Sequence, residues 1–136
     1  MITKNYTEDI IREVVRWLEN SLNTPLLIES IAGKSGYSRW YFQRIFKKST
    51  GVALGTYVRE RRLARAALDL KLTRKTVLEI ALKYGFESQQ TFTRSFKKKF
   101  SLPPGRYRKE RECDLTLLNL PLSFPESNPD DILKKQ

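Results

Sequence analysis

Histidine is absent from the 136 residues of this chain. Without histidine, neither a Ser-His catalytic triad nor a histidine-ligated metal site can be built. The six glycines also match no phosphate-binding fingerprint. We therefore expect no catalytic residues, no metal ligands and no cofactor, and the sequence does not favour an enzyme.

Cysteine and long apolar runs are scarce as well. Cys113 is the single cysteine and cannot form an internal disulfide, which agrees with a reducing compartment. No stretch reaches the roughly 18 apolar residues that a membrane span requires, since Asn119 and Pro121 interrupt LTLLNLPLSF. The opening MITKNYTEDIIREVV lacks the apolar core of a signal peptide. We expect a cytoplasmic protein that has no membrane partner.

Acidic residues are few relative to basic ones. The chain has 26 Lys and Arg against 15 Asp and Glu, which gives a net charge of +11. So basic a chain favours a polyanionic partner, most often nucleic acid. Charge alone would also suit an anionic membrane surface, a non-specific architectural DNA-binding protein or an RNA-binding protein.

The chain contains two copies of one unit. The stretch VLEIALKYGFESQQTFTRSFKKKF (77–100) repeats IESIAGKSGYSRWYFQRIFKKSTG (28–51), at a spacing of 49 residues that becomes 50 after one insertion. Each copy has a short helix with an apolar face, a glycine suited to the left-handed conformation (Gly36 or Gly85), and a second helix opened by serine or a nearby acid. This pattern is typical of a helix-turn-helix.

The segments around the two copies are also predicted to be helical. Apolar spacing indicates a first helix that starts near Thr7 and stops before Pro25, and Pro103, Pro104 and Gly105 begin a short last helix. The fold prediction is all-α with about seven helices, arranged as two homeodomain-like helix-turn-helix subdomains bridged by a long helix. The expected boundaries are 1–53 for the first subdomain, 54–70 for the linker helix, 71–112 for the second subdomain and 113–136 for a weakly ordered tail.

The second helix of the first copy has two unlike faces. If Ser38 caps it, a rotation of about 100° per residue places Tyr41, Phe42, Ile45 and Phe46 on the inner arc. The outer arc holds Trp40, Gln43, Arg44 and Lys47, flanked by Arg39 and Lys48. Trp40 is thus predicted to face away from the core, although a different helix start would bury it.

The second helix of the later copy has the same division. Counting from Ser88 places Phe92, Phe96 and Phe100 inward and Gln90, Thr93, Arg94 and Lys97 outward. Lys99 falls near the apolar arc, which we interpret as fraying at the helix end.

The outward side chains are of the types that read DNA. In the major groove, arginine pairs with guanine, glutamine with adenine, and threonine or an aromatic ring contacts the thymine methyl group. Basic residues that continue the helices suit phosphate oxygens. The predicted base-reading residues are Trp40, Gln43, Arg44, Gln89, Gln90, Thr91, Thr93 and Arg94, and the predicted DNA-backbone contacts on these helices are Arg39, Lys47, Lys48, Lys97 and Lys98.

The connecting helix sets the expected geometry. A helix over 54–70 is roughly 26 Å long and would bring the two recognition helices to about one DNA turn, roughly 34 Å. Because both helices lie on one chain and differ in sequence, we expect a monomer that binds an asymmetric site. The chain has no room for a separate effector domain, so we expect no small-molecule effector and control through the protein's own abundance.

The paired motifs SGYSRWYFQRIFKKSTG and YGFESQQTFTRSFKKKF, followed by PPGRYR, resemble those of the AraC/XylS transcription regulators, most closely the short stand-alone MarA/SoxS/TetD-like subgroup. The resemblance runs from about residue 7 to 110 and implies a bacterial activator that binds double-stranded promoter DNA, lies with the nucleoid when bound, and contacts RNA polymerase. It also suggests target genes of drug efflux and oxidative stress. The family's base-reading positions match those predicted above, and Arg59 matches a backbone-contacting position. Leu27 departs from the family's usual polar cap.

For several of these residues, an ordinary structural role is the alternative to DNA contact. Gln89, Gln90, Thr91 and Thr93 could be ordinary capping and first-turn residues. Most of the cluster Arg59, Arg61, Arg62 and Arg65 could form a solvated or salt-bridged face.

Overall fold

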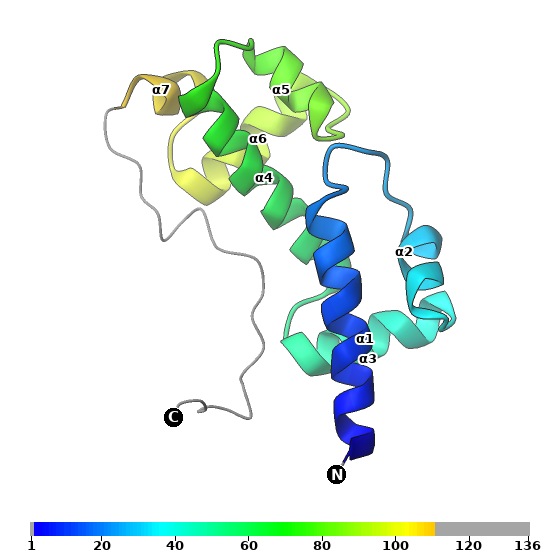
Figure 1. Ribbon diagram of the computed structural model, residues 1–136. Coiled ribbons are helices and arrows are strands. Elements are labelled where there is room, and N and C mark those ends of the chain that lie inside the picture. Colours follow the sequence, from blue (N-terminus) through cyan, green and yellow to red (C-terminus); the bar gives the residue numbers. More distant parts are fainter. Residues whose placement is uncertain (1, 111–136) are drawn as a thin grey trace, which may run out of the picture.

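The computed structural model describes residues 2–110, which form seven α-helices and no strand (Figure 1). The all-α prediction is therefore confirmed. Two helix bounds differ from expectation, because the first helix begins well before Thr7 and the long helix extends two residues past Leu70. The predicted tail, 113–136, lies outside the described residues. The helices are α1 (Ile2–Glu19), α2 (Ile28–Ser35), α3 (Arg39–Thr50), α4 (Leu54–Leu72), α5 (Val77–Lys83), α6 (Gln89–Phe100) and α7 (Pro104–Lys109).

Helices α1, α2 and α3 pack on one another and are called the first unit, and α5, α6 and α7 form the second unit. The long helix α4 contacts α3 on one side and all three helices of the second unit on the other. In Figure 1, α4 runs diagonally between the two units. None of the helices within residues 2–110 is long and apolar enough to cross a membrane.

The ends of the repeated helices follow local sequence rules. The Ser38 hydroxyl accepts a hydrogen bond from the Tyr41 amide at 3.2 Å, and the Ser88 hydroxyl accepts one from the Thr91 amide at 3.1 Å. Both serines therefore cap their helices, as predicted. Gly36 and Gly85 have φ angles of 83° and 82°, in the left-handed region that glycine tolerates best. Leu27 precedes α2 and supplies no side-chain cap.

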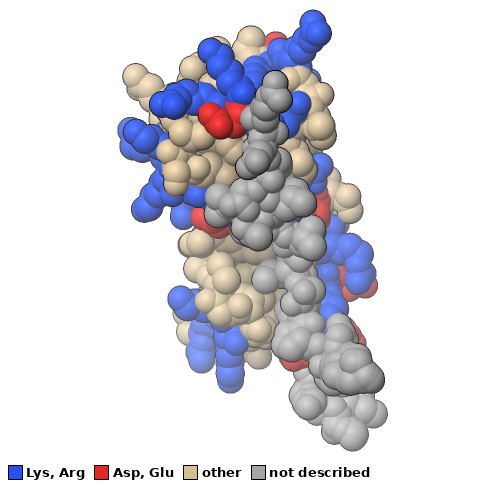
Figure 2. Space-filling model, turned by 90° about the vertical axis from the view of Figure 1, so that its left-hand side faces the viewer, with Lys and Arg blue, Asp and Glu red and all other residues tan. Residues whose placement is uncertain are grey.

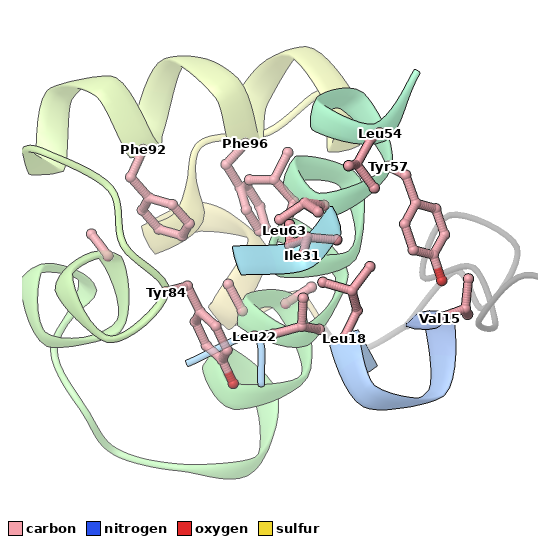
Figure 3. Packing of buried hydrophobic residues seen from close by; sticks show 14 of the residues in the cluster. Val15, Leu18, Leu22, Ile31, Leu54, Tyr57, Leu63, Tyr84, Phe92 and Phe96 are labelled. Atoms are coloured by element: carbon pink, nitrogen blue, oxygen red, sulfur yellow. The ribbon is translucent and has the colours of Figure 1, made fainter. Parts of the chain in front are cut away.

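The core contains matching aromatic residues from the two units. Figure 3 shows Phe92 and Phe96 of the second unit near Leu63 of α4 and Ile31 of the first unit. Phe42 and Phe46 of α3, and Phe92 and Phe96 of α6, are fully buried. Helix α4 contributes to both halves of this core because it is buried on several sides. Its buried hydrophobic residues are Leu54, Tyr57, Val58, Leu63, Ala64, Ala66, Ala67 and Leu70.

Two details of the predicted helix faces are corrected. The helical count places Tyr41 on the inner arc, but it is 43% exposed and its ring packs edge-on against Tyr37, with 4.9 Å between centroids. The fraying proposed for Lys99 is wrong, because α6 continues to Phe100 and the Lys99 ammonium donates a hydrogen bond to Glu60 of α4 at 2.6 Å. A lysine on the apolar arc is accommodated because a carboxylate meets it there.

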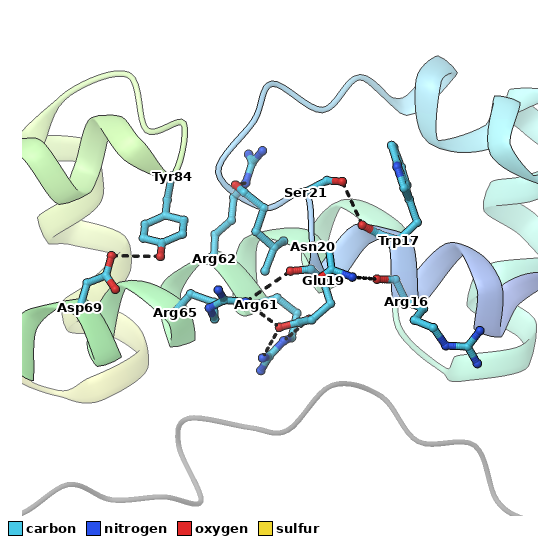
Figure 4. Close-up of polar contacts among 11 residues, drawn as sticks. Arg16, Trp17, Glu19, Asn20, Ser21, Arg61, Arg62, Arg65, Asp69 and Tyr84 are labelled. Atoms are coloured by element: carbon cyan, nitrogen blue, oxygen red, sulfur yellow. Dashed lines mark hydrogen bonds and ion pairs between the residues drawn. The ribbon is translucent and has the colours of Figure 1, made fainter. Parts of the chain in front are cut away.

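The arginine cluster of α4 is largely engaged in structural contacts (Figure 4). Arg61 is buried and donates two hydrogen bonds to the Glu19 carboxylate, at 3.0 and 2.7 Å. Arg65 also pairs with Glu19, at 3.4 Å. The salt-bridged interpretation is thus confirmed for these two residues, whereas Arg62 donates to backbone carbonyl groups and Arg59 is exposed.

Candidate nucleic-acid interface

The outer face of α3 carries the residues that the sequence places there. Trp40 is 65% exposed, so the alternative in which it enters the core is excluded. The Arg44 guanidinium lies 4.8 Å from the centroid of the Trp40 ring, a cation–π contact that holds the arginine along the helix surface. An open groove of about 520 Å³ runs beside these residues and is lined by Trp40, Gln43, Arg44, Lys47, Lys48, Ala53, Leu54 and Gly55.

The outer face of α6 forms a second groove of similar size. Its volume is about 500 Å³, and it is lined by five residues of α6 only, all predicted DNA contacts: Gln89, Gln90, Thr93, Arg94 and Lys97. Thr91 is not among them. The Ser88 hydroxyl donates to the Thr91 hydroxyl at 3.1 Å, so this threonine takes part in the helix cap, as in the alternative noted from the sequence.

The residues predicted to contact the DNA backbone are exposed, and one of them, Arg39, pairs with a carboxylate of the protein. Lys47, Lys48, Lys97 and Lys98 are exposed at the ends of α3 and α6. Arg39 is 3.3 Å from Glu29 in a pair whose side chains are both more than half exposed. Such a surface pair is worth only about 0–1 kcal/mol, so a phosphate group could displace the carboxylate.

The groove beside α3 reaches the N-terminal end of α4, where Leu54 and Gly55 line it. Gly55 lines the groove beside α3 and also a cavity of about 220 Å³ between the two units. Gly85 and Phe86, which lead into α6, also line that cavity, as does Arg59 of α4. In Figure 1, α3 and α6 both run from right to left. The cavity that Arg59 lines therefore connects the groove beside α3 with the turn that precedes α6.

Basic side chains mark both levels of the molecule. Figure 2 shows Lys and Arg gathered near the top of the visible face, at the level of the second unit, and again near the bottom, at the level of α3. Uncharged surface lies between them on the left of this view, and further Lys and Arg lie at its right edge. Such basic regions suit contact with a polyanion. Within residues 2–110, no group of three or more acidic or cysteine side chains could hold a metal ion.

Sequence reasoning missed two features of this interface. Gly55 lies in the first turn of α4, where no turn requires a glycine, and sequence reasoning assigned it no role although it lines the groove beside α3. The contact between Trp40 and Arg44 could have been predicted from their i,i+4 spacing on α3.

These features define a DNA-binding protein of the helix-turn-helix class, with two such units on one chain. A family model described as a helix-turn-helix domain matches residues 31–110. The chain is 48% identical over 116 residues to the transposon Tn10 TetD protein of Escherichia coli, a match that covers 85% of this chain and 84% of TetD. It is 44% identical over 108 residues to the multiple antibiotic resistance protein MarA of Salmonella typhimurium, covering 79% of this chain and 85% of MarA. The chain belongs to the AraC/XylS family of DNA-binding transcription regulators, and within it is similar to the short MarA/SoxS-like members.

Other relatives place the same region in longer proteins or on DNA. The right origin-binding protein of Escherichia coli strain K12 is 48% identical over 117 residues, but the match covers only 40% of that protein. The DNA-binding domain of AdpA, solved in complex with a target DNA, has a TM-score of 0.68 at 29% identity and covers 71% of this chain and 87% of that domain. An AraC-type regulator from Chromobacterium violaceum has a TM-score of 0.70 at 30% identity and covers 77% of this chain and 96% of that structure. These relatives are transcription regulators rather than enzymes, and DNA is the partner that the family shares.

Proposed function

We propose that this chain binds an asymmetric promoter site as a monomer, with α3 and α6 in successive major grooves, and activates transcription by recruiting RNA polymerase. The observation that supports this most directly is the pair of exposed, unlike polar faces on α3 and α6. A dimer of identical helix-turn-helix units would read a palindrome, whereas two different units on one chain suit two different half-sites.

The proposed contacts follow from the chemistry of the exposed groups. Arg44 and Arg94 would pair with guanine in their respective grooves, and Trp40 would contact a thymine methyl group or a sugar. Arg59, which lines the cavity between the two units, would bind a phosphate group. The remaining proposed base-reading residues are Gln43, Gln89, Gln90, Thr91 and Thr93, and the remaining proposed phosphate contacts are Arg39, Lys47, Lys48, Lys97 and Lys98.

The proposed domain division keeps 1–53 and 71–112 as the two reading subdomains and 54–70 as the body of the linker helix. The packing of α1 with α2 and α3, and of α6 with α5 and α7, supports this division. We propose no small-molecule effector, with activity set by the abundance of the protein in the bacterial cytoplasm, where it would lie with the nucleoid. Similarity to the multiple antibiotic resistance protein supports target genes of stress or drug resistance.

Selection of bound duplexes from a random pool tests the binding mode. The expected product is an asymmetric site with two unlike half-sites about one helical turn apart, roughly 10 base pairs. Sedimentation of the complex should give one protein per duplex. The selected duplex then competes against random duplex, and comparable affinities would replace this proposal with that of a non-specific architectural DNA-binding protein. Transcription in vitro with purified RNA polymerase tests activation.

A further inference from the structure

Arg62 lies in the middle of α4 and holds the loop that enters the first unit's α2. Its Nε donates a hydrogen bond to the Leu22 carbonyl oxygen at 3.0 Å, and its Nη2 donates one to the Thr24 carbonyl oxygen at 2.8 Å. Figure 4 shows Arg62 between this loop and Tyr84 of the second unit. Both carbonyl groups belong to the segment between α1 and α2, so the guanidinium fixes that segment against α4.

The same guanidinium lies close to Gly85 of the second unit. A Cβ atom placed on Gly85 would lie 3.1 Å from Nη1 and 3.4 Å from Cζ of Arg62. The equivalent glycine of the first unit, Gly36, has nothing within 4 Å of such an atom. Glycine at position 85 therefore serves a second purpose beyond its left-handed φ angle, because it lets the turn that leads into α6 lie directly on the guanidinium.

Neighbouring charged residues of α4 form ion pairs with the two units. Arg61 forms its ion pair with Glu19 of the first unit, Glu60 with Lys99 of the second, and Asp69 with Lys83 of the second. These pairs attach each unit to α4. Arg62 donates hydrogen bonds to the first unit and lies close to Gly85 of the second, so it relates the two units to each other.

The guanidinium is well suited to this role. It is planar and rigid, so two hydrogen bonds from one edge fix the plane on which the Gly85 turn rests. Burial lowers the pKa of Arg62, since desolvation disfavours its charge, but an arginine stays protonated at neutral pH. A lysine has one flexible ammonium group and could not supply the same plane.

We infer that Arg62 is a positioning residue that fixes the orientation of α3 relative to α6 and thereby sets the spacing between the two half-sites on DNA. This inference rests on the two-groove binding proposed above. A rigid pair of readers binds its second half-site at a high effective concentration, but only at the spacing that matches their separation.

The test uses the full chain, the Arg62→Met variant and three duplexes: the selected site, the same site with one half scrambled, and the site with one base pair inserted between the halves. We expect Arg62→Met to bind the selected site about tenfold more weakly than the wild type and the half-scrambled site within about twofold of it. Insertion of one base pair should weaken DNA binding by a smaller factor for the variant than for the wild type. Equal losses on all three duplexes, or no loss on any, would overturn the inference.

Arg59→Met is the matched control, because Arg59 lies one turn earlier on α4 and lines the same cavity. As a phosphate contact, it should weaken binding to the selected site and the inserted site by the same factor. Circular dichroism and thermal unfolding establish that each variant folds, and Arg62→Lys replaces Arg62→Met if the latter does not. If neither scrambling nor insertion changes the affinity of the wild-type protein, the two-groove proposal itself is refuted. If scrambling and insertion weaken wild-type binding and affect the Arg62 variant by the same factors, only the role of Arg62 is refuted.

Discussion

The Lys99 ammonium of α6 donates a hydrogen bond to the Glu60 carboxylate of α4 at 2.6 Å, although the Lys99 side chain is only 10% exposed. The two residues are 39 positions apart in the sequence. Their pairing holds the inner side of α6 against α4 while Gln90 and Arg94 remain outward. The charge pair thus attaches the second reading helix to the element shared by both units.

Glu60→Gln is expected to destabilise the protein by about 1–3 kcal/mol, because it leaves a poorly solvated ammonium group without this carboxylate. Urea denaturation measures the change. The control is Glu13→Gln, which removes the partner of Arg16 in a surface pair whose side chains are 65% and 74% exposed. That substitution should change the free energy of unfolding by less than about 1 kcal/mol. Equal effects would show that burial of the Lys99 pair contributes nothing.

Arg44→Ala and Arg94→Ala are each expected to reduce discrimination at one base step by about 1–3 kcal/mol and to leave non-specific binding nearly intact. Affinities for a set of duplexes with single base-pair changes measure this directly. Arg16→Ala, on the exposed side of α1, is the control and should leave the whole set unchanged. A uniform loss on every sequence would assign either arginine to a phosphate instead.

Gly55→Ala is expected to stabilise the free protein and weaken its binding to DNA. No atom lies within 4 Å of a Cβ at this position, so alanine fits and should add up to about 0.5–1 kcal/mol of helix stability. Gly55 lines both the groove beside α3 and the cavity between the units, so the added methyl group would project into that space. Calorimetry and DNA titration give the two quantities.

Gly33→Ala provides the matched control for Gly55→Ala. Gly33 lies in α2, has the same open space around an added methyl group, and lines neither the groove beside α3 nor the cavity between the units. Gly33→Ala should also stabilise the protein, but it should leave the affinity for DNA unchanged. Unchanged DNA affinity in Gly55→Ala would mean that no DNA group approaches this glycine closely.

Alkaline pH is expected to weaken the contact between α4 and α5. The Asp69 carboxylate accepts hydrogen bonds from the Lys83 ammonium at 2.8 Å and the Tyr84 hydroxyl at 3.0 Å. The bond to Asp69 raises the pKa of Lys83 above its ordinary 10.5, and burial followed by Asp69 raises the pKa of Tyr84 above its ordinary 10.0. Above these ordinary values the folded protein retains protons that the unfolded chain has lost. The stabilisation is complete at lower pH and falls as the pH rises through the two raised values.

Urea denaturation across this alkaline range compares the wild type with Asp69→Asn. The variant should be less stable at neutral pH and should lose less stability as the pH rises, because its Lys83 no longer has a carboxylate partner. Burial of Tyr84 remains in the variant, so a smaller slope is expected rather than none. Parallel curves for the two proteins would contradict the role given to Asp69.

Much of the architecture follows from short stretches of sequence. The cap at Ser38, the cap at Ser88 and the spacing of Phe42 from Phe46 are local features, so they predicted the helix starts and the buried faces. The outward position of Trp40 followed from the same count. Helix periodicity depends on residues three and four apart, and a single sequence contains that information completely.

Tertiary structure alone decided how the two units meet. The pairing of Lys99 with Glu60 and the contacts of Arg62 with the Leu22 carbonyl and Gly85 join residues from distant parts of the chain. No periodic pattern records such partners, because each depends on how α4 packs against both units at once. The sequence by itself therefore determined the helices and which face of each reading helix is polar, whereas packing around α4 determined how the two units that carry these faces are held together.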